Sequence, residues 1–364
     1  KMRNLIKNFF KSKFTIKIPP KKKFLIFDLH SEKIIREVLK GDFNVLPTRL
    51  EKISLIILLY SSIINFKDTI KFRKIYFNYL KTFITFSNPI YVITFIDNDK
   101  RFFELKKYFN HTKFIAVQNG YRFYKDDLFE LIENTDSILE CDEYYCFGDQ
   151  VKNYLTNRVN ADYYSIGSVK NNFCKKNKHV KKINICYISS YGISTNIFEK
   201  EILQNLYKYC NNKKIGLEVL ARTNSYDEEK FYFEILKNKD FIFHKKSDDF
   251  CNSYNVIDST MLSVSLNNTL GYENLARNNK TYFINVNDRN LGCDSFLKFG
   301  YPGNFDEKGF FWTNKFDLQK IISEIDYIYN LSTEEWKNKT DKITKKIINY
   351  DADNSFLKNK LNQL

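Results

Sequence analysis

Residues 264–285 carry the side chains best suited to binding a phosphorylated ligand. The segment reads VSLNNTLGYENLARNNKTYFIN. Its polar run at 267–269 follows an apolar β-type run and favours the N-cap of a helix over about 270–277. Unpaired backbone N–H groups at such a helix start attract anions. Glu273, expected in the first turn, would accept hydrogen bonds from ribose hydroxyls. The segment predicts a nucleotide-sugar site, the alternative being an ordinary capped crossover. The residues expected at the phosphate are Asn268, Thr269 and Leu270.

Two further strand ends in the second half of the chain could bind phosphate. Ser189 and Ser190 follow one apolar run, and Arg222 follows the next. A guanidinium group offers a fixed fork of donors to a phosphate, although a surface ion pair with Asp227 or Glu228 is the alternative. Neither a G-x-G-x-x-G pattern nor a P-loop is present, so dinucleotide binding and ATP hydrolysis are not indicated.

The first half of the chain offers groups for a sugar and for catalysis. The turn Gln118-Asn119-Gly120 combines two amides, which suit a hydroxyl-rich sugar, with a glycine that permits a positive φ; an ordinary tight turn is the alternative. A carboxylate facing the ligand is needed as a base or nucleophile. The catalytic candidates are Asp97, Asp99 and Asn119. The candidates for binding sugar or acceptor are Asp28, His30, Gln118, Gly120 and Arg122.

Charge is concentrated at the beginning of the sequence. Residues 1–23 hold nine Lys or Arg and no acid, out of a net charge of +15 for 364 residues. Apolar residues at helical spacing among them predict a basic amphipathic arm for an anionic membrane surface, or alternatively a solvated extension. The apolar run at 53–64 is far shorter than the roughly 20 residues that span a bilayer, and predicts a buried helix. No signal peptide is recognised.

The cysteines and histidines indicate neither a zinc site nor another metal centre. Seven cysteines lack the spacing of paired ligands, and four histidines form no recognisable cluster. Reduced thiols in the cytoplasm fit this odd number best. Asp97-Asn98-Asp99 is formally D-x-D, but it lies in the half of the chain that is not expected to bind the nucleotide. We therefore expect neither a metal nor a cofactor, the nucleotide-sugar being a substrate.

Alternating strand and helix patterns predict an α/β protein with two Rossmann-like domains that face each other across a cleft. A polar, basic stretch between the two series marks a linker. The expected parts are a basic N-terminal arm at 1–23, an acceptor domain at 24–167, a linker at 168–182, a nucleotide-sugar domain at 183–330 and C-terminal helices at 331–364.

Several segments resemble a family of bacterial surface-carbohydrate biosynthesis proteins with the two-domain GT-B glycosyltransferase fold. The matching segments are VQNGYR, YYCFGDQVKNYL, SIGSVKNN, ICYIS, YNVIDST, NTLGYENLARNNKTYFIN, FGYPGNFDEKGFFWTN and STEEW, in this order from residue 117 onward. The family is distantly similar to retaining β-Kdo transferases, which use CMP-Kdo. The resemblance implies a cytidine-nucleotide donor in the second domain and a glycan acceptor at the first. Where the family usually has Ser-Thr at the helix start, this chain has Asn268-Thr269.

Together these patterns predict a metal-independent glycosyltransferase at the inner face of the cytoplasmic membrane. Its partners would be a nucleotide-sugar donor and a glycan or lipid-linked acceptor. One alternative is a polyol-phosphate transferase with a CDP-linked donor. Another is a non-enzymatic basic protein that binds nucleic acid, but the excess charge is confined largely to one arm and no recognition module is present.

Overall fold

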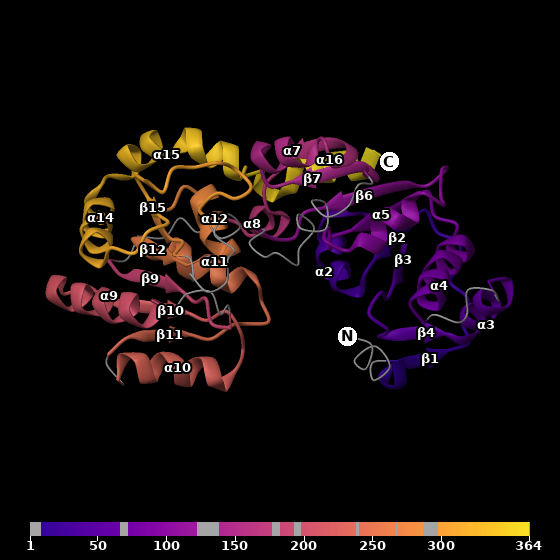
Figure 1. Cartoon of the computed structure of the whole chain (residues 1–364), viewed down its shortest axis with the longest axis horizontal. Coiled ribbons are helices and arrows are strands. Elements are labelled where there is room, and N and C mark those ends of the chain that lie inside the picture. Colours follow the sequence, from indigo (N-terminus) through magenta and orange to yellow (C-terminus); the bar gives the residue numbers. More distant parts are fainter. Residues whose placement is uncertain are drawn as a thin grey trace.

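The computed structural model describes residues 9–65, 72–121, 138–176, 183–192, 198–237, 240–266, 268–286 and 298–363. The chain forms two α/β lobes side by side, the N-terminal one in indigo and purple and the C-terminal one in red and orange (Figure 1). Each lobe is built on its own sheet, and the predicted fold class is confirmed.

The N-terminal lobe has a six-stranded parallel sheet in the order β3-β2-β5-β6-β7-β8. Its strands are β2 Phe24–Phe27, β3 Phe43–Leu46, β5 Tyr91–Thr94, β6 Lys113–Val117, β7 Leu139–Cys146 and β8 Val159–Ser165. Its helices are α2 Leu29–Val38, α3 Leu55–Ile64, α4 Phe72–Ser87, α5 Lys100–Lys106 and α7 Asp149–Leu155. A separate two-stranded parallel sheet pairs β1 Lys13–Thr15 with β4 Lys52–Ser54.

The sequence of β2 shows why both faces of this sheet are covered. All four residues of the strand, FLIF, are buried. Successive side chains of a strand point to opposite faces. Leu25 and Phe27 accordingly join one core cluster, and Phe24 and Ile26 join another. A continuous apolar run of this kind is typical of a parallel sheet between two helical layers.

The C-terminal lobe has a seven-stranded sheet in the order β11-β10-β9-β12-β13-β15-β14, parallel except for β14. Its strands are β9 Ile185–Ile188, β10 Leu217–Leu220, β11 Ile242–His244, β12 Leu262–Ser265, β13 Thr281–Ile284, β14 Lys308–Gly309 and β15 Trp312–Thr313. Its helices are α9 Glu199–Lys213, α10 Tyr226–Leu236, α11 Cys251–Asp258, α12 Thr269–Ala276, α14 Leu318–Asn330 and α15 Thr333–Ile347.

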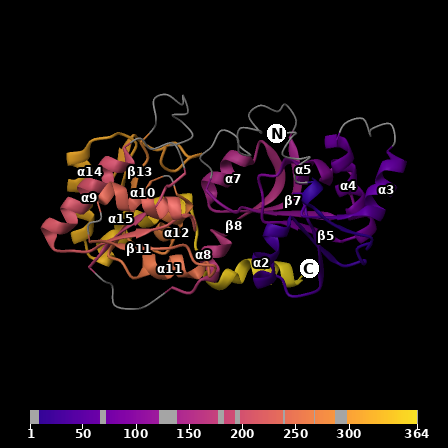
Figure 2. The same ribbon diagram turned by 90° about the horizontal axis from the view of Figure 1, so that it is seen from below.

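The last helix of the chain returns to the first lobe. After α15 and a short 3-10 turn at Ala352–Asn354, helix α16 Ser355–Gln363 packs on α2 (Figure 2). Its Leu357 and Leu361 are buried in the core cluster that contains Ile35 of α2. The lobes are thus connected twice, by this C-terminal segment and by the segment that follows β8.

The segment predicted as a linker is partly helical and buried. Helix α8 Val169–Phe173 begins there, capped by the Ser168 hydroxyl, and Asn171 and Asn172 are almost fully buried. Burial is possible for this polar segment because its amides are satisfied internally; Asn172 Nδ2, for example, donates to the Ile166 carbonyl at 2.8 Å. Residues 177–182 lie outside the described part.

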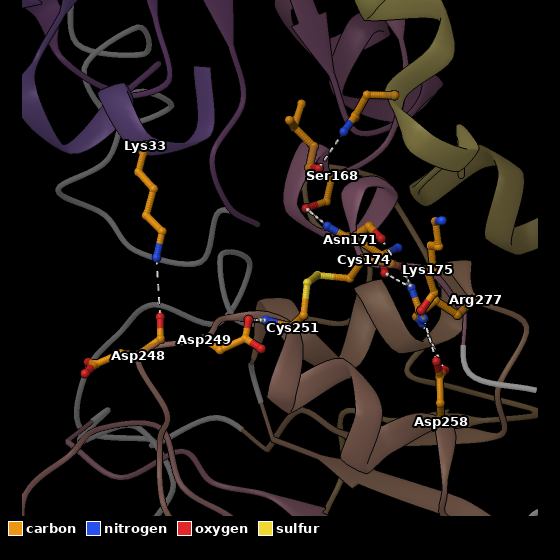
Figure 3. Close-up of a disulfide and its surroundings, with 12 residues drawn as sticks. Lys33, Ser168, Asn171, Cys174, Lys175, Asp248, Asp249, Cys251, Asp258 and Arg277 are labelled. Carbon is orange, nitrogen blue, oxygen red and sulfur yellow. Dashed lines mark hydrogen bonds and ion pairs between the residues drawn. A yellow bond between two sulfur atoms is a disulfide. The ribbon is translucent and has the colours of Figure 1, made fainter. Parts of the chain in front are cut away.

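A buried ion pair lies where the segment after β8 meets the C-terminal lobe. It joins Arg277, just after α12, to Asp258 of α11 (Figure 3). Neither side chain is exposed. The Arg277 guanidinium also donates to the carbonyls of Asn171, Cys174 and Lys175, at 3.2, 2.9 and 3.1 Å. A single cation of the C-terminal lobe therefore holds the end of α8 in place.

A disulfide between Cys174 and Cys251 attaches the same segment to the first residue of α11. The expectation of reduced thiols is therefore wrong for this pair, which is separated by 77 residues and carries no spacing signal. The described cysteines outside it, Cys141, Cys146, Cys186 and Cys210, are buried free thiols, and Cys293 lies outside the described residues.

Residues 1–8, which hold much of the predicted amphipathic N-terminal arm, lie outside the described residues. The described part of the arm is helical at residues 9–11 and then forms β1, which pairs in parallel with β4. Another prediction for the first lobe is wrong. The apolar run at 53–64 forms α3, but only Ile57 and Ser61 of that helix are buried. No described helix is both long enough and apolar enough to cross a bilayer.

Candidate functional site

A pocket of about 500 Å³ opens at the carboxyl ends of the C-terminal strands, beside the N-terminal lobe. Ligands of parallel α/β sheets bind at this edge. The β9, β10 and β12 ends and helices α11 and α12 form its wall, while Asn119 enters from the first lobe and Lys170 from α8. Its lining residues are Asn119, Lys170, Ile188, Ser189, Leu220, Ala221, Arg222, Thr223, Lys246, Ser247, Phe250, Ser253, Tyr254, Asn268, Thr269, Leu270 and Glu273.

Helix α12 points its N-terminus into this pocket, as expected. It begins at Thr269, with Asn268 as the N-cap. Asn268 Oδ1 accepts the Leu270 N–H at 2.9 Å, and its Nδ2 donates to the Ser189 carbonyl at 2.8 Å. The Asn268 side chain therefore already caps one of the amides that we expected to be bare. The helix dipole still places partial positive charge at this end.

A glycine lets α12 lie close to its sheet. A Cβ at Gly271 would lie 2.6 Å from Ser265 Cβ and 3.0 Å from Phe283 Cε1. Contacts this short would push the helix off β12 and β13. Gly271 therefore sets the position of the helix start relative to the β9 and β12 ends that line the pocket.

The loop after β6 docks the first lobe on that helix start. The Tyr121 N–H donates to Thr269 Oγ1 at 3.1 Å, and the Tyr121 ring stacks on Tyr272 with centroids 3.7 Å apart. Gly120 does not use a positive φ, and a Cβ there would make only an ordinary 3.5 Å contact with Thr269 Oγ1. The expected conformational role of Gly120 is therefore wrong.

Gln118 and Asp97 support this loop from behind. Gln118 Oε1 accepts the Phe147 N–H at 2.8 Å, and its Nε2 donates to the Gly120 carbonyl at 3.0 Å. Asp97 is buried, and its carboxylate accepts from the Asn119 N–H at 3.1 Å and the Tyr144 hydroxyl at 2.7 Å. Neither residue is among the described residues that line the pocket, so both position Asn119 instead of facing a ligand.

The candidates Asp99, Asp28 and His30 also lie away from the pocket. Asp99 caps α5 and pairs with Arg101. Asp28 is fully buried at φ 84°, caps α2, accepts from Thr48 Oγ1 at 2.6 Å and pairs with Arg49. His30 is exposed in the first turn of α2. Asp28 and Asp99 therefore follow their strands because each of them caps the next helix.

The Glu228 carboxylate binds the residues that follow β9 and β10 at the wall of the pocket. It is fully buried and accepts the N–H groups of Arg222 and Thr223, both at 2.7 Å, and the Ser189 hydroxyl at 2.5 Å. The Arg222 guanidinium itself donates to the Tyr191 carbonyl at 2.8 Å and lines the pocket. The expected alternative, a side-chain pair between Arg222 and Glu228, is not what forms. Ser190 is buried and is not among the described lining residues.

Glu273 is the buried carboxylate of the pocket. It lies in the second turn of α12, not the first, because the helix begins at Thr269. The Ser168 hydroxyl at the start of α8 donates to its Oε1. Burial raises the pKa of Glu273, while Ser168, Lys170 and Tyr254 lower it. Because Glu273 lines the pocket and its Ser168 donor is neutral, its carboxyl group can also accept hydrogen bonds from ligand hydroxyls.

The sequence reasoning missed Lys170, Lys246, Ser247, Phe250, Ser253 and Tyr254. The last three belong to α11 or its N-cap, a helix that was not predicted. Two of the segments that carry the family resemblance, SIGSVKNN and YNVIDST, contain Lys170 and Tyr254, and they were the available signal. Arg122 lies outside the described residues. Within the described ranges, no three His, Cys, Asp or Glu side chains group closely enough to hold a metal ion.

Comparison with known proteins places the chain in a family. Residues 115–201 and 196–364 match a family described as "putative O-antigen biosynthesis protein". No curated protein matches the sequence.

Solved structures share the fold over nearly the whole chain. One is the S. aureus MnaA–UDP co-structure, at TM-score 0.52 and 11% identity over 94% of this chain and 95% of that one. Another is a glycosyltransferase from Rickettsia africae ESF-5, at 0.52 and 14% over 94% and 97%. A third is the wall teichoic acid polymerase TagF, H444N with CDPG, at 0.54 and 12% over 100% and 93%. At these identities the likeness shows the fold alone, which is that of GT-B glycosyltransferases.

Proposed function

Because the chain belongs to this family of O-antigen biosynthesis proteins, we propose that it is a glycosyltransferase of surface-polysaccharide biosynthesis. It would transfer a sugar from a nucleotide-sugar donor to a glycan or lipid-linked acceptor at the inner face of the cytoplasmic membrane. The observation that carries the proposal is the pocket in which a helix N-terminus, three cations and one buried carboxylate converge.

The charge of the pocket suits the phosphate of a nucleotide. Lys170, Arg222 and Lys246 line it together with one carboxylate, Glu273. Two positive charges in excess, with the positive end of α12 beside them, would stabilise the leaving phosphate as the bond to the sugar breaks. This is the work that a divalent cation does in metal-dependent transferases, so we propose that the reaction needs none.

Polar groups that line the same pocket would orient the sugar portion of the donor. Glu273 would accept hydrogen bonds from ribose hydroxyls, while the Ser168 hydroxyl donates to its Oε1. Asn119 enters from the acceptor lobe on a loop that is fixed to Thr269 and Asp97. Asn119 is therefore the candidate for contact with the transferred sugar or with the acceptor.

The family resemblance favours CMP-Kdo as the donor. A second candidate function is transfer of a polyol phosphate from a CDP-linked donor, because three cations also match the larger charge of a diphosphate. Product analysis separates the two, since only the second reaction leaves a phosphodiester.

A thermal-shift series with CMP, CDP, UDP and GDP tests the proposal, because a ligand that binds only the folded state raises its stability. At least one nucleotide should raise the melting temperature. The Lys246→Ala variant should bind that nucleotide about tenfold more weakly, as expected for the loss of one charge-assisted hydrogen bond. The matched control is Lys245→Ala, since Lys245 pairs with Glu229 at 2.8 Å and is not a described lining residue. Equal losses in both variants, or no shift with any nucleotide, would refute the proposal.

A further inference from the structure

Helix α3 carries an apolar face that the described part of the protein leaves uncovered. Its sequence is LIILLYSSII, without one charged residue. Six large side chains recur at helical spacing and are between 37% and 74% exposed. They are Leu55, Ile56, Leu59, Tyr60, Ile63 and Ile64, which together we call the α3 face. A helix that is apolar all round is normally buried in a core or in lipid, and an exposed patch of this kind marks an interaction site.

The polypeptide beside α3 is strongly basic. Strand β1 pairs with β4, which runs directly into α3, and Ser54 Oγ donates to the Lys17 carbonyl at 2.8 Å. Residues 9–23 and 52–65 together contain seven lysines and no acidic residue, and Glu51 immediately precedes the second range. One of the seven, Lys22, pairs with Asp42 at 2.7 Å. The other six are Lys11, Lys13, Lys17, Lys21, Lys23 and Lys52.

Further apolar side chains lie among these lysines. Phe10, Phe14, Ile16 and Ile18 are 77%, 46%, 70% and 46% exposed. Figure 1 shows β1, β4 and α3 gathered at one corner of the N-terminal lobe. Exposed apolar side chains and lysines therefore alternate over one region, instead of occurring singly across the surface.

We propose that this region, with the α3 face at its centre, docks the protein on an anionic lipid bilayer. The choice of occupant rests on charge: a protein partner would need to match the apolar face and the six lysines other than Lys22 at once, whereas an anionic bilayer offers both chemistries over its whole surface. The ten residues of α3 span about 15 Å, half of a hydrocarbon core, so the helix lies along the interface and does not cross it.

The test uses the full chain and sedimentation with vesicles. Protein should sediment with vesicles of phosphatidylglycerol and phosphatidylcholine in equal parts, and much less with phosphatidylcholine alone or at high salt. The double variant Leu59→Glu and Ile63→Glu should lower the vesicle partition constant by at least about tenfold, because each buried Leu or Ile contributes about that factor. A matched pair of glutamates on the other lobe, Tyr226→Glu with Tyr327→Glu, should leave it unchanged; those tyrosines are 76% and 51% exposed.

A second variant covers the case in which the α3 variant fails to fold. Lys11→Gln with Lys17→Gln changes only exposed side chains and should weaken binding to the anionic vesicles alone. Binding that both variants leave intact overturns the proposal. So does a wild-type dimer that the α3 variant converts to monomer, because the face would then cover a second copy. Nucleotide-induced thermal shifts should be the same in all these variants, so that this inference and the proposed function succeed or fail separately.

Discussion

Removing the guanidinium of Arg277 while keeping most of its volume, as in Arg277→Met, should destabilise the C-terminal lobe by about 3–5 kcal/mol, the usual cost of leaving a buried charge without its partner. The structure supports the upper part of this range. The variant loses the ion pair with Asp258 and three bonds to backbone carbonyls. Asn279 Nδ2 still donates to Asp258 at 2.7 Å, but a neutral amide does not balance the buried carboxylate.

The assay is urea denaturation followed by tryptophan fluorescence. Both tryptophans, Trp312 in β15 and Trp336 in α15, belong to the C-terminal lobe, so the signal reports the lobe that contains the ion pair. The double variant Arg277→Met with Asp258→Leu should recover more than half of the loss, because replacing a whole buried pair by apolar groups is often close to neutral. A loss below about 1 kcal/mol, or a double variant as unstable as the single one, would show that Arg277 does not hold α8 as described.

Three more expected results concern the pocket and its supports. Burial raises the pKa of Glu273 in the folded protein. The protonated carboxyl group therefore contributes stability below the pKa that Glu273 has in the unfolded chain, and this contribution is lost as pH rises through the folded pKa. The free energy of unfolding of wild type, relative to that of Glu273→Gln, should fall with rising pH over this window. Gly271→Ala should cost about 1–3 kcal/mol and weaken nucleotide binding, whereas Gly120→Ala, with a 3.5 Å nearest contact, should do neither in paired melting and titration experiments. Cys251→Ser should cost roughly 2–4 kcal/mol for loss of a 77-residue cross-link, and equal urea midpoints for wild type with and without reductant would contradict this.

The sequence predicts the framework well where pattern and local chemistry agree. Helix α12 begins and ends within one residue of the range expected from its polar cap and the apolar run before it. This helix is defined by neighbouring residues alone. The continuous apolar strands also indicate correctly that helices cover both sides of the sheets.

Where the sequence misleads, the cause lies in contacts between distant residues. A run such as α3, which is uncharged and is interrupted only by Ser61 and Ser62, has no polar stripe to mark an exposed face, so its sequence predicts burial. The amides of α8 look like linker composition until Arg277 and Glu273 are placed beside them. Asp97 and Asp28 follow strands as catalytic carboxylates do, but loop and cap hydrogen bonds hold them in the interior.

Calorimetric titration of Glu273→Ala measures the central claim most directly. The ligand is whichever of CMP, CDP, UDP and GDP stabilises the wild type most. The nucleotide should bind several-fold more weakly to the variant, while tryptophan fluorescence confirms that the C-terminal lobe is folded. If the nucleotide binds the folded variant and the wild type with identical affinity, the pocket beside α12 is not its binding site.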